Sequence, residues 1–378
     1  MKSFIATRLA KIRDAGLLRK LPGTVEGIDF WSNDYLGLSR LSSPTTNYQP
    51  PITNHSATGS RSISGDFDEY HALEKHIATY HGQEAALIFN SGYTANLGLL
   101  SALLRRTDTI FYDELMHASC RDGIRLGQAR AFRFANNDLE DLQQQLHKAR
   151  PDGNIFVLTE GRFSMDGDLG PVAKLAELCE AHGAHLIVDE AHSGGIEGKN
   201  GAGLVAGLGL QQRVFATVMT YGKAFGSHGA AVLGSHALRE YLINTSRPFI
   251  YSTAPAPAQW ADISAAYAKL AAAHQPQHTK LQAIISLFRT KMEISSLAHL
   301  LLPATGPIQI LQIPGNKAVM QVETACKTAG LLVKGIRSPT VAVGSERIRL
   351  CLHAFNTESE LEHLVNCLRS QLLTPEES

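Results

Sequence analysis

One lysine in this chain lies beside a glycine at the end of an apolar, β-branched run. The run covers residues 214–220 and is followed by Tyr221, Gly222 and Lys223. A lysine in apolar surroundings, with small residues around it, can form a Schiff base with a carbonyl compound. A lysine next to glycine is more often a solvated loop residue. Lys223 therefore indicates catalysis only if other groups at the same site support that chemistry.

A second apolar run supplies two such groups. Residues 186–188 end in Asp189, and His192 follows three positions later. Ligands of open α/β sheets bind at the carboxyl ends of the strands. A carboxylate there can hold the protonated ring nitrogen of pyridoxal 5'-phosphate (PLP), and an imidazole can hydrogen-bond the phenolic oxygen of that ring. The alternative is an aspartate that caps the next helix. Taken with Lys223, the pair makes an enzyme the leading hypothesis.

Three further polar groups follow other apolar runs. His117 could stack on a flat cofactor ring, although most histidines are structural or exposed. Residues 90–96 join a strand to a helix through Gly92, and the free amides at a helix start bind anions such as phosphate. A plain capped turn is the alternative there. Ser164 also follows a strand. These groups favour one site at the strand ends.

Several other chemistries are excluded by spacing. A P-loop requires glycine five positions before Gly222 and a hydroxyl residue after the lysine, whereas Thr217 and Ala224 occupy those positions. The chain contains no G-x-S-x-G nucleophile elbow and no H-E-x-x-H metal motif. A serine hydrolase is therefore not expected, and no metal site is predicted.

Composition limits the partners and the compartment. The 378 residues include 35 basic and 35 acidic residues, so the formal charge is zero and neither nucleic acid nor an anionic membrane is an expected partner. Five scattered cysteines without a C-x-x-C pair predict free thiols in a reducing compartment. Charged residues interrupt the N-terminal stretch, and no run approaches the roughly twenty apolar residues of a membrane span. A cytoplasmic protein is expected.

From about residue 66, helical and extended patterns alternate. The expected helices cover residues 70–80, 96–104, 139–148 and 172–182. The expected strands cover residues 85–89, 109–112, 155–159, 185–188, 214–220 and 230–233. This alternation predicts an α/β fold with a mostly parallel central sheet and helices on both faces.

The flanking segments suggest the domain organisation. A helical stripe precedes Pro22, an Ala-rich helix is expected over residues 260–274, and strands and a helix after residue 308 suit a small α+β domain. We therefore expect an N-terminal arm (1–44), a large PLP-binding domain (45–272) and a small C-terminal domain (273–378).

Over nearly its whole length the chain resembles the α-oxoamine synthases, PLP enzymes of fold type I. The matching motifs are Ser-Asn-Asp-Tyr-Leu-Gly-Leu at 32–38, Thr-Gly-Ser-Arg at 58–61, Phe-Asn-Ser-Gly-Tyr at 89–93, His-Ala-Ser at 117–119, Thr-Glu-Gly at 159–161, Phe-Ser-Met-Asp-Gly at 163–167, Asp-Glu-Ala-His at 189–192 and Thr-Tyr-Gly-Lys-Ala-Phe-Gly at 220–226. Jointly these motifs are highly specific.

The resemblance implies a role for each residue of the cofactor site. Lys223 would hold PLP covalently and then remove the α-proton of the amino acid. Asp189 would keep the ring nitrogen protonated, and His117 would stack on the ring. Ser164 and His192 would contact the ring oxygen or the substrate. The remaining cofactor contacts would come from Gly92, Tyr93 and Thr220.

The resemblance also implies a shared dimer and a substrate site. Ser252 and Thr253 would reach the PLP phosphate of the neighbouring subunit, which implies a homodimer. Together with His117, the substrate site would be lined by Arg19, Asn33, Thr340 and Arg349. Of these, Arg349 would pair with the carboxylate of the amino acid through two parallel bonds.

Within the family, the compact chain is most similar to the biotin-pathway synthases. These enzymes condense L-alanine with a pimeloyl thioester of coenzyme A or acyl carrier protein and release CO2. Ser193 stands where the family often has glycine, and it is similar to the serine palmitoyltransferase version. Serine palmitoyltransferase and 2-amino-3-ketobutyrate ligase therefore stay as alternatives within the family. A non-catalytic PLP-fold scaffold is the alternative from another class.

Overall fold

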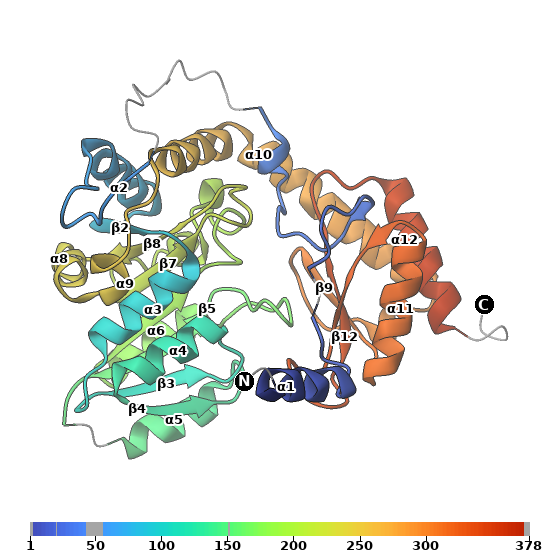
Figure 1. The fold of residues 1–378 in the computed structure, drawn as a ribbon, viewed down its shortest axis with the longest axis horizontal. Coiled ribbons are helices and arrows are strands. Elements are labelled where there is room, and N and C mark those ends of the chain that lie inside the picture. The colour runs from blue at the N-terminus through green and yellow to red at the C-terminus, as the bar shows by residue number, and fades with distance from the viewer. Residues whose placement is uncertain (1–2, 20, 43–55, 150–151, 374–378) are drawn as a thin grey trace.

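A seven-stranded sheet forms the centre of the described chain. The computed structural model describes residues 3–19, 21–42, 56–149 and 152–373 (Figure 1). Its strand order is β2-β8-β7-β6-β5-β3-β4, and all neighbours are parallel except β8, which is antiparallel to both β2 and β7. The strands are β2 (Ala85–Phe89), β3 (Thr109–Asp113), β4 (Arg130–Phe134), β5 (Ile155–Glu160), β6 (Ala184–Asp189), β7 (Ala216–Thr220) and β8 (Ala230–Gly234).

Helices cover both faces of this sheet, because the central strands are buried on both sides. One face packs against α3 (Gly92–Leu103), α4 (Ala118–Gly127), α8 (His236–Thr245) and α9 (Arg247–Ile250). The other face packs against α2 (Asp68–His81), α5 (Leu139–Lys148), α6 (Val172–Ala181), α7 (Leu204–Gly207) and part of α10 (Pro257–Ile294). The side chains of each strand alternate between the two cores, as strand geometry requires.

A smaller antiparallel sheet lies beside the C-terminal half of α10 (Figure 1). Its order is β11-β12-β9, from β9 (Ile308–Gln312), β11 (Lys334–Ile336) and β12 (Arg347–Cys351). The helices α11 (Asn316–Thr328) and α12 (Glu358–Leu372) pack against it. The single helix α10 thus connects the two sheets.

The N-terminal segment joins the smaller sheet region. After α1 (Ser3–Asp14), the short β1 (Ile28–Asp29) pairs in parallel with β10 (Leu331–Leu332). Three 3-10 turns complete the described elements: η1 (Leu38–Arg40), η2 (Lys199–Gly201) and η3 (Ala298–Leu300). The predicted domain boundary at 44/45 lies outside the described residues. The boundary at 272/273 falls inside α10, and both boundaries stay predictions.

The predicted alternation is confirmed, with differences at its edges. The sequence missed β4 because four of its five residues are exposed and it has no continuous apolar run. The helices α4, α8 and α11 were also not predicted. The helix expected at 96–104 begins at Gly92, and the helix expected at 260–274 extends to Ile294. That helix continues past Pro276 because buried residues on both sides of the proline, including Leu270 and Leu281, hold it against the core.

All five cysteines are free thiols in the structure, and the reducing compartment stays a prediction. Within the ranges described above, no helix is long and apolar enough to cross a membrane.

Candidate active site

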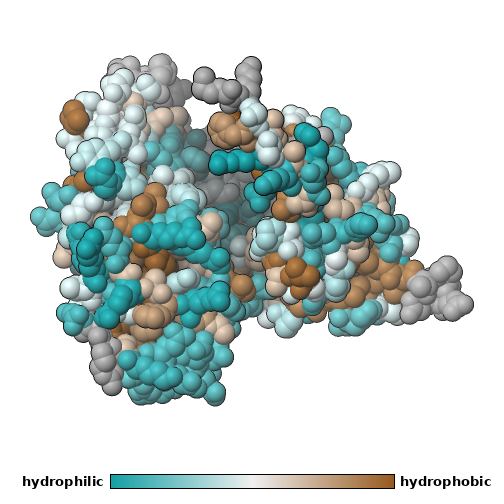
Figure 2. Space-filling model, turned by 60° about the horizontal axis from the view of Figure 1, so that its bottom comes forward, coloured by the Kyte–Doolittle hydropathy of each residue, from teal (hydrophilic) through white to brown (hydrophobic). Residues whose placement is uncertain are grey.

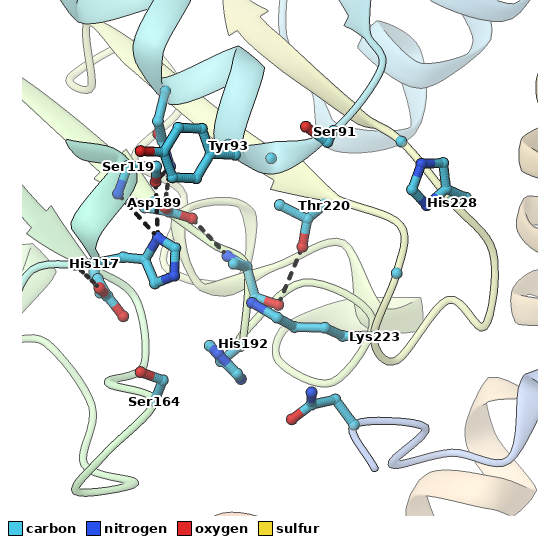
Figure 3. A pocket seen from close by; sticks show the side chains of 17 residues that line it. Ser91, Tyr93, His117, Ser119, Ser164, Asp189, His192, Thr220, Lys223 and His228 are labelled. Carbon is cyan, nitrogen blue, oxygen red and sulfur yellow. Dashed lines mark hydrogen bonds between the residues drawn. The ribbon is translucent and has the colours of Figure 1, made fainter. Parts of the chain in front are cut away.

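A pocket of about 280 Å³ opens at the carboxyl ends of β5, β6 and β7 (Figure 3). Figure 2 shows that the surface is hollowed between the body of the large sheet and that of the small sheet. Parallel strands bring their carboxyl ends to one edge, which explains why residues far apart in sequence meet here. From the sequence prediction, the lining residues are Asn33, Gly92, Tyr93, His117, Ser164, Asp189, His192, Thr220 and Lys223.

Lys223 lies in a closed loop that follows β7. The amide of Tyr221 donates to the carbonyl of Gly229 at 2.9 Å, and the amide of Ser227 donates to the carbonyl of Tyr221 at 2.8 Å. These bonds fix the loop on both sides of the lysine. Burial lowers the pKa of Lys223 to about 8, although the charges of Asp189 and Glu160 oppose that shift. A neutral, nucleophilic amine is therefore accessible near neutral pH.

Asp189 lies on the floor of the pocket and is held by neutral donors. Its Oδ2 accepts from Asn96 Nδ2 at 2.7 Å, and its Oδ1 accepts from the amide of Ala191 at 2.9 Å. No lysine or arginine of the described residues forms an ion pair with this buried carboxylate. The arrangement fits a cationic ring nitrogen, which would supply the missing positive charge.

His117 is positioned by β5 and α4. Its amide donates to Glu160 Oε1 at 2.8 Å, and its Nδ1 lies 2.8 Å from Ser119 Oγ. Burial lowers the pKa of His117 and raises the pKa of Glu160 to about 8, with the nearby charge of Asp189 adding to the second shift. The imidazole is thus fixed as a flat, neutral group on the wall of the pocket.

His192 belongs to a network that leads to Arg349. His192 Nδ1 lies 2.8 Å from the hydroxyl of Tyr35, which also lies 3.0 Å from Asn33 Oδ1. The guanidinium of Arg349 donates from Nη2 to Asn33 Oδ1 at 3.0 Å and from Nε to the carbonyl of Ser164 at 2.7 Å. Burial holds the pKa of His192 well below its ordinary value, so this ring is neutral.

Arg349 is a buried cation without a counter-ion. It is 7% exposed, and its hydrogen-bond partners are neutral oxygens. Within the described ranges, no carboxylate lies within 4.0 Å of it, whereas Arg347 on the same strand pairs with Asp166 Oδ1. A buried charge is costly unless it is paired, so this position fits an anionic ligand.

The start of α3 forms the other end of the pocket. Ser91 caps the helix by accepting from the amide of Thr94, which leaves the amides of Gly92 and Tyr93 without a partner in the described chain. A Cβ on Gly92 would lie only 2.6 Å from Thr220 Cγ2, so the position admits glycine alone. Free amides with a nearby hydroxyl suit a phosphate.

Four predicted site residues lie elsewhere in the single chain. Ser252 and Thr253 line a separate, small cavity beside Arg61. Arg19 and Thr340 are exposed and do not line the pocket. Their predicted roles stay predictions.

Several lining residues were not assigned from the sequence. Those with polar side chains are Ser91, Asn96, Ser119, Glu160 and His228. Asn96 lies in the stretch between a strand and a helix that the sequence analysis singled out, and Glu160 directly follows a predicted strand. Their position just after a strand was the signal that could have identified them. Tyr35 lay in the motif at 32–38, but nothing local shows that it meets His192. No cluster of three or more metal-ligating side chains occurs in the part of the chain that the structure describes.

Comparisons with known proteins agree with this geometry. The family model for aminotransferase class I and II matches residues 25–368. The 8-amino-7-oxononanoate synthase of Alkalilimnicola ehrlichii is 40% identical over 345 residues, covering 90% of this chain and 86% of that protein.

Two solved structures are similar over nearly the full length. The 8-amino-7-oxononanoate synthase of Francisella tularensis is 31% identical, with a TM-score of 0.75 and coverage of 92% of this chain and 98% of that chain. A serine palmitoyltransferase variant from S. paucimobilis, with a bound PLP–myriocin aldimine, is 24% identical, with a TM-score of 0.85 and coverage of 98% and 96%. The latter likeness is one of fold.

Proposed function

The chain belongs to the aminotransferase class I and II family and, within it, to the α-oxoamine synthases, and we propose that it makes 8-amino-7-oxononanoate. The reaction joins L-alanine to a pimeloyl thioester, of coenzyme A or acyl carrier protein, and releases CO2 and the free thiol. The observation that carries the proposal is Arg349, a buried and uncompensated guanidinium beside a pocket that contains a lysine of lowered pKa. A free guanidinium of this kind can bind the carboxylate of an amino acid.

The residues of the pocket fit PLP as the cofactor. When bound, PLP supplies an electron sink for negative charge at the α-carbon of the amino acid. Lys223 and Asp189 would hold its aldehyde carbon and its ring nitrogen, and His117 would lie against the ring. The partner-free amides of Gly92 and Tyr93 would bind its phosphate. All of these groups lie in the same pocket, and each can make the kind of bond that its proposed part of PLP requires.

His192 would donate to the phenolic oxygen of the cofactor. Tyr35 has a single hydroxyl proton, and it can donate this proton to Asn33 Oδ1 or to His192 Nδ1. When Tyr35 donates to Nδ1, the neutral imidazole carries its own proton on Nε2. A ligand oxygen in the pocket selects that tautomer, because it accepts from Nε2.

The two remaining roles, binding of the substrate carboxylate and proton transfer, fall to Arg349 and Lys223. Arg349 binds the substrate carboxylate through its guanidinium and so orients the α-carbon toward Lys223. The Nζ of Lys223, with a pKa of about 8, accepts the α-proton and can return it. A pKa near the working pH suits a group that acts in both directions.

We further propose that the active form is a homodimer with shared sites. Ser252 and Thr253 lie outside the pocket of their own chain, next to Tyr251, whose side chain is 72% exposed. A second copy that covers this surface would bring both hydroxyl residues to the pocket of the partner. The five free thiols support a reducing, cytoplasmic location.

Serine palmitoyltransferase activity is the weaker alternative. Ser193 was its support in the sequence, yet Ser193 is fully buried and does not line the pocket. Its hydroxyl faces Gly161, where a Cβ would lie 2.3 Å from Ser193 Oγ. Ser193 is therefore not placed to contact a substrate bound in the pocket.

The test compares two substrate pairs on the PLP-loaded enzyme. We expect turnover of L-alanine with pimeloyl coenzyme A, and a product with the mass of 8-amino-7-oxononanoate. L-serine with palmitoyl coenzyme A serves as the matched pair. Preferred turnover of the serine pair would replace the proposal with its alternative. A protein whose absorbance does not change on addition of PLP would support the non-catalytic scaffold.

A further inference from the structure

The two sides of the candidate pocket differ in their ionisable side chains. Figure 3 shows His117, Ser164 and His192 on one side of Lys223, and Ser91, Thr220 and His228 on the other. The second side is the one with the unpartnered amides at the start of α3. A phosphate bound there would carry up to two negative charges against neutral donors.

His228 is the one group on that side that can add positive charge. Apart from Lys223, no lysine or arginine lines the pocket in the described ranges. Lys223 is committed to the aldehyde carbon of the cofactor, and His117 and His192 lie on the far side. An imidazole can donate N–H to a phosphate oxygen and, when protonated, also supplies a full charge.

The backbone fixes His228 while its side chain stays free. The amide of the preceding Ser227 donates to the carbonyl of Tyr221, and the carbonyl of the following Gly229 accepts from the amide of Tyr221. Gly229 has a φ of +105°, a left-handed conformation that favours glycine at this position of the loop. The imidazole itself is exposed to the pocket and has no hydrogen-bond partner in the described structure.

We propose that His228 binds the phosphate group of a ligand in this pocket. The inference rests on the proposed function, which places the PLP phosphate at the start of α3. A second phosphate could come from the carrier of the acyl thioester, since coenzyme A also ends in phosphate esters. The chemistry is the same for both sources, and the experiment separates them.

The first experiment measures cofactor affinity rather than activity. Apoenzyme, as wild type, His228→Ala and His228→Arg, is titrated with PLP and with pyridoxal, which lacks the phosphate, and binding is followed by absorbance. We expect the Kd for PLP to rise about tenfold in His228→Ala, with the Kd for pyridoxal changed less than about twofold. His228→Arg should restore most of the PLP affinity. His236→Ala, an exposed histidine on α8 outside the pocket, is the matched control.

The second experiment identifies the source of the phosphate. If the carrier supplies it, the Kd for PLP stays unchanged in His228→Ala, while KM rises for the coenzyme A thioester and not for a short N-acetylcysteamine thioester. Either pattern supports the proposal. Equal losses of PLP and pyridoxal affinity, or no change in PLP affinity and in either KM, would overturn it. The titrations need no turnover, so a wild type that binds PLP but fails with L-alanine refutes the proposed function alone.

Discussion

Two clusters of buried charge in this molecule are built in opposite ways. Near the edge of the large sheet, Glu74 accepts from Arg61, from Arg239 Nη2 at 2.7 Å and from the amide of Ile88 at 3.0 Å. At the pocket and directly behind it, Asp189 and Arg349 are each buried among neutral hydrogen-bond partners. Among the described residues, neither of them nor Lys223 forms an ion pair. The first cluster is compensated within the chain, whereas the second is not.

This difference separates structural charges from those that await a ligand. A buried charge is tolerated when its partner is fixed beside it, and removing that partner is strongly destabilising. Uncompensated buried charges lower the stability of a protein because they are desolvated without a partner, so we expect those of the pocket to cost stability unless a ligand pairs with them. Arg162 with Glu197, and Arg347 with Asp166, repeat the compensated pattern close to the pocket.

The largest expected effect is on kcat and follows from removing Lys223 from the uncompensated cluster. Replacing Lys223 with alanine should lower kcat by about 10³-fold or more, because the chain loses both its covalent anchor and its base. Stopped assays of product formation on PLP-loaded protein measure this. Lys174→Ala, an exposed lysine on α6, is the control and should keep full activity. A Lys223→Ala protein with activity within tenfold of wild type would contradict the assignment.

Removing the shared carboxylate of the compensated cluster should lower stability rather than activity. Glu74→Gln leaves two guanidinium groups, Arg61 and Arg239, without their shared carboxylate, and we expect a loss of about 3–5 kcal/mol in the free energy of unfolding. Denaturant unfolding of the apoenzyme measures it, with the exposed neighbour Lys75→Gln as control. Activity per folded molecule should stay within twofold of wild type. A large loss of kcat without a loss of stability would show that Glu74 is more than structural.

The pH dependence of stability should report the cost of burying Lys223 in the uncompensated cluster. Burial lowers the pKa of Lys223 from 10.5 to about 8, so between these values the folded apoenzyme binds fewer protons than the unfolded chain. Stability from this group is therefore lowest below pH 8 and rises as pH increases toward 10.5, by at most about 3 kcal/mol.

The matched measurement compares wild-type apoenzyme with Lys223→Met at pH 7.5 and pH 10. Lys223→Met should be the more stable protein at pH 7.5, and its advantage should shrink at pH 10. A constant difference between the two proteins across this range would mean that Lys223 is not strained by its burial.

The smallest expected effect is on KM, and it is tested by comparing two arginines on the same strand. Arg349→Met should raise KM for L-alanine about 10- to 100-fold, since a charge-assisted bond to the substrate carboxylate is lost. Arg347→Met, two residues earlier on β12, removes an arginine that Asp166 already neutralises. It should change thermal stability more than KM. Equal effects of both variants on KM would remove the distinction between free and paired cations.

Much of this organisation was predictable from local patterns. The apolar runs gave β5, β6 and β7 within two residues of their observed ends, and the polar residues that follow them met in one pocket as strand-end geometry requires. Lys223, Asp189 and His192 needed nothing beyond this rule and the known chemistry of their side chains. β4 was missed because an exposed edge strand has no continuous apolar run.

The sequence by itself determined the α/β alternation, the strand-end position of the reactive groups and the family. Only the tertiary structure decided which charges are left without partners. The local pattern of residues does not distinguish Arg347 from Arg349, and only the family resemblance singled out Arg349. In the structure Arg347 meets Asp166, whereas Arg349 meets Asn33, which lies more than three hundred positions away along the chain. Ser193 likewise turned away from the pocket into the core. The reason is physical: pairing and burial depend on contacts between distant segments, which no local pattern of residues encodes.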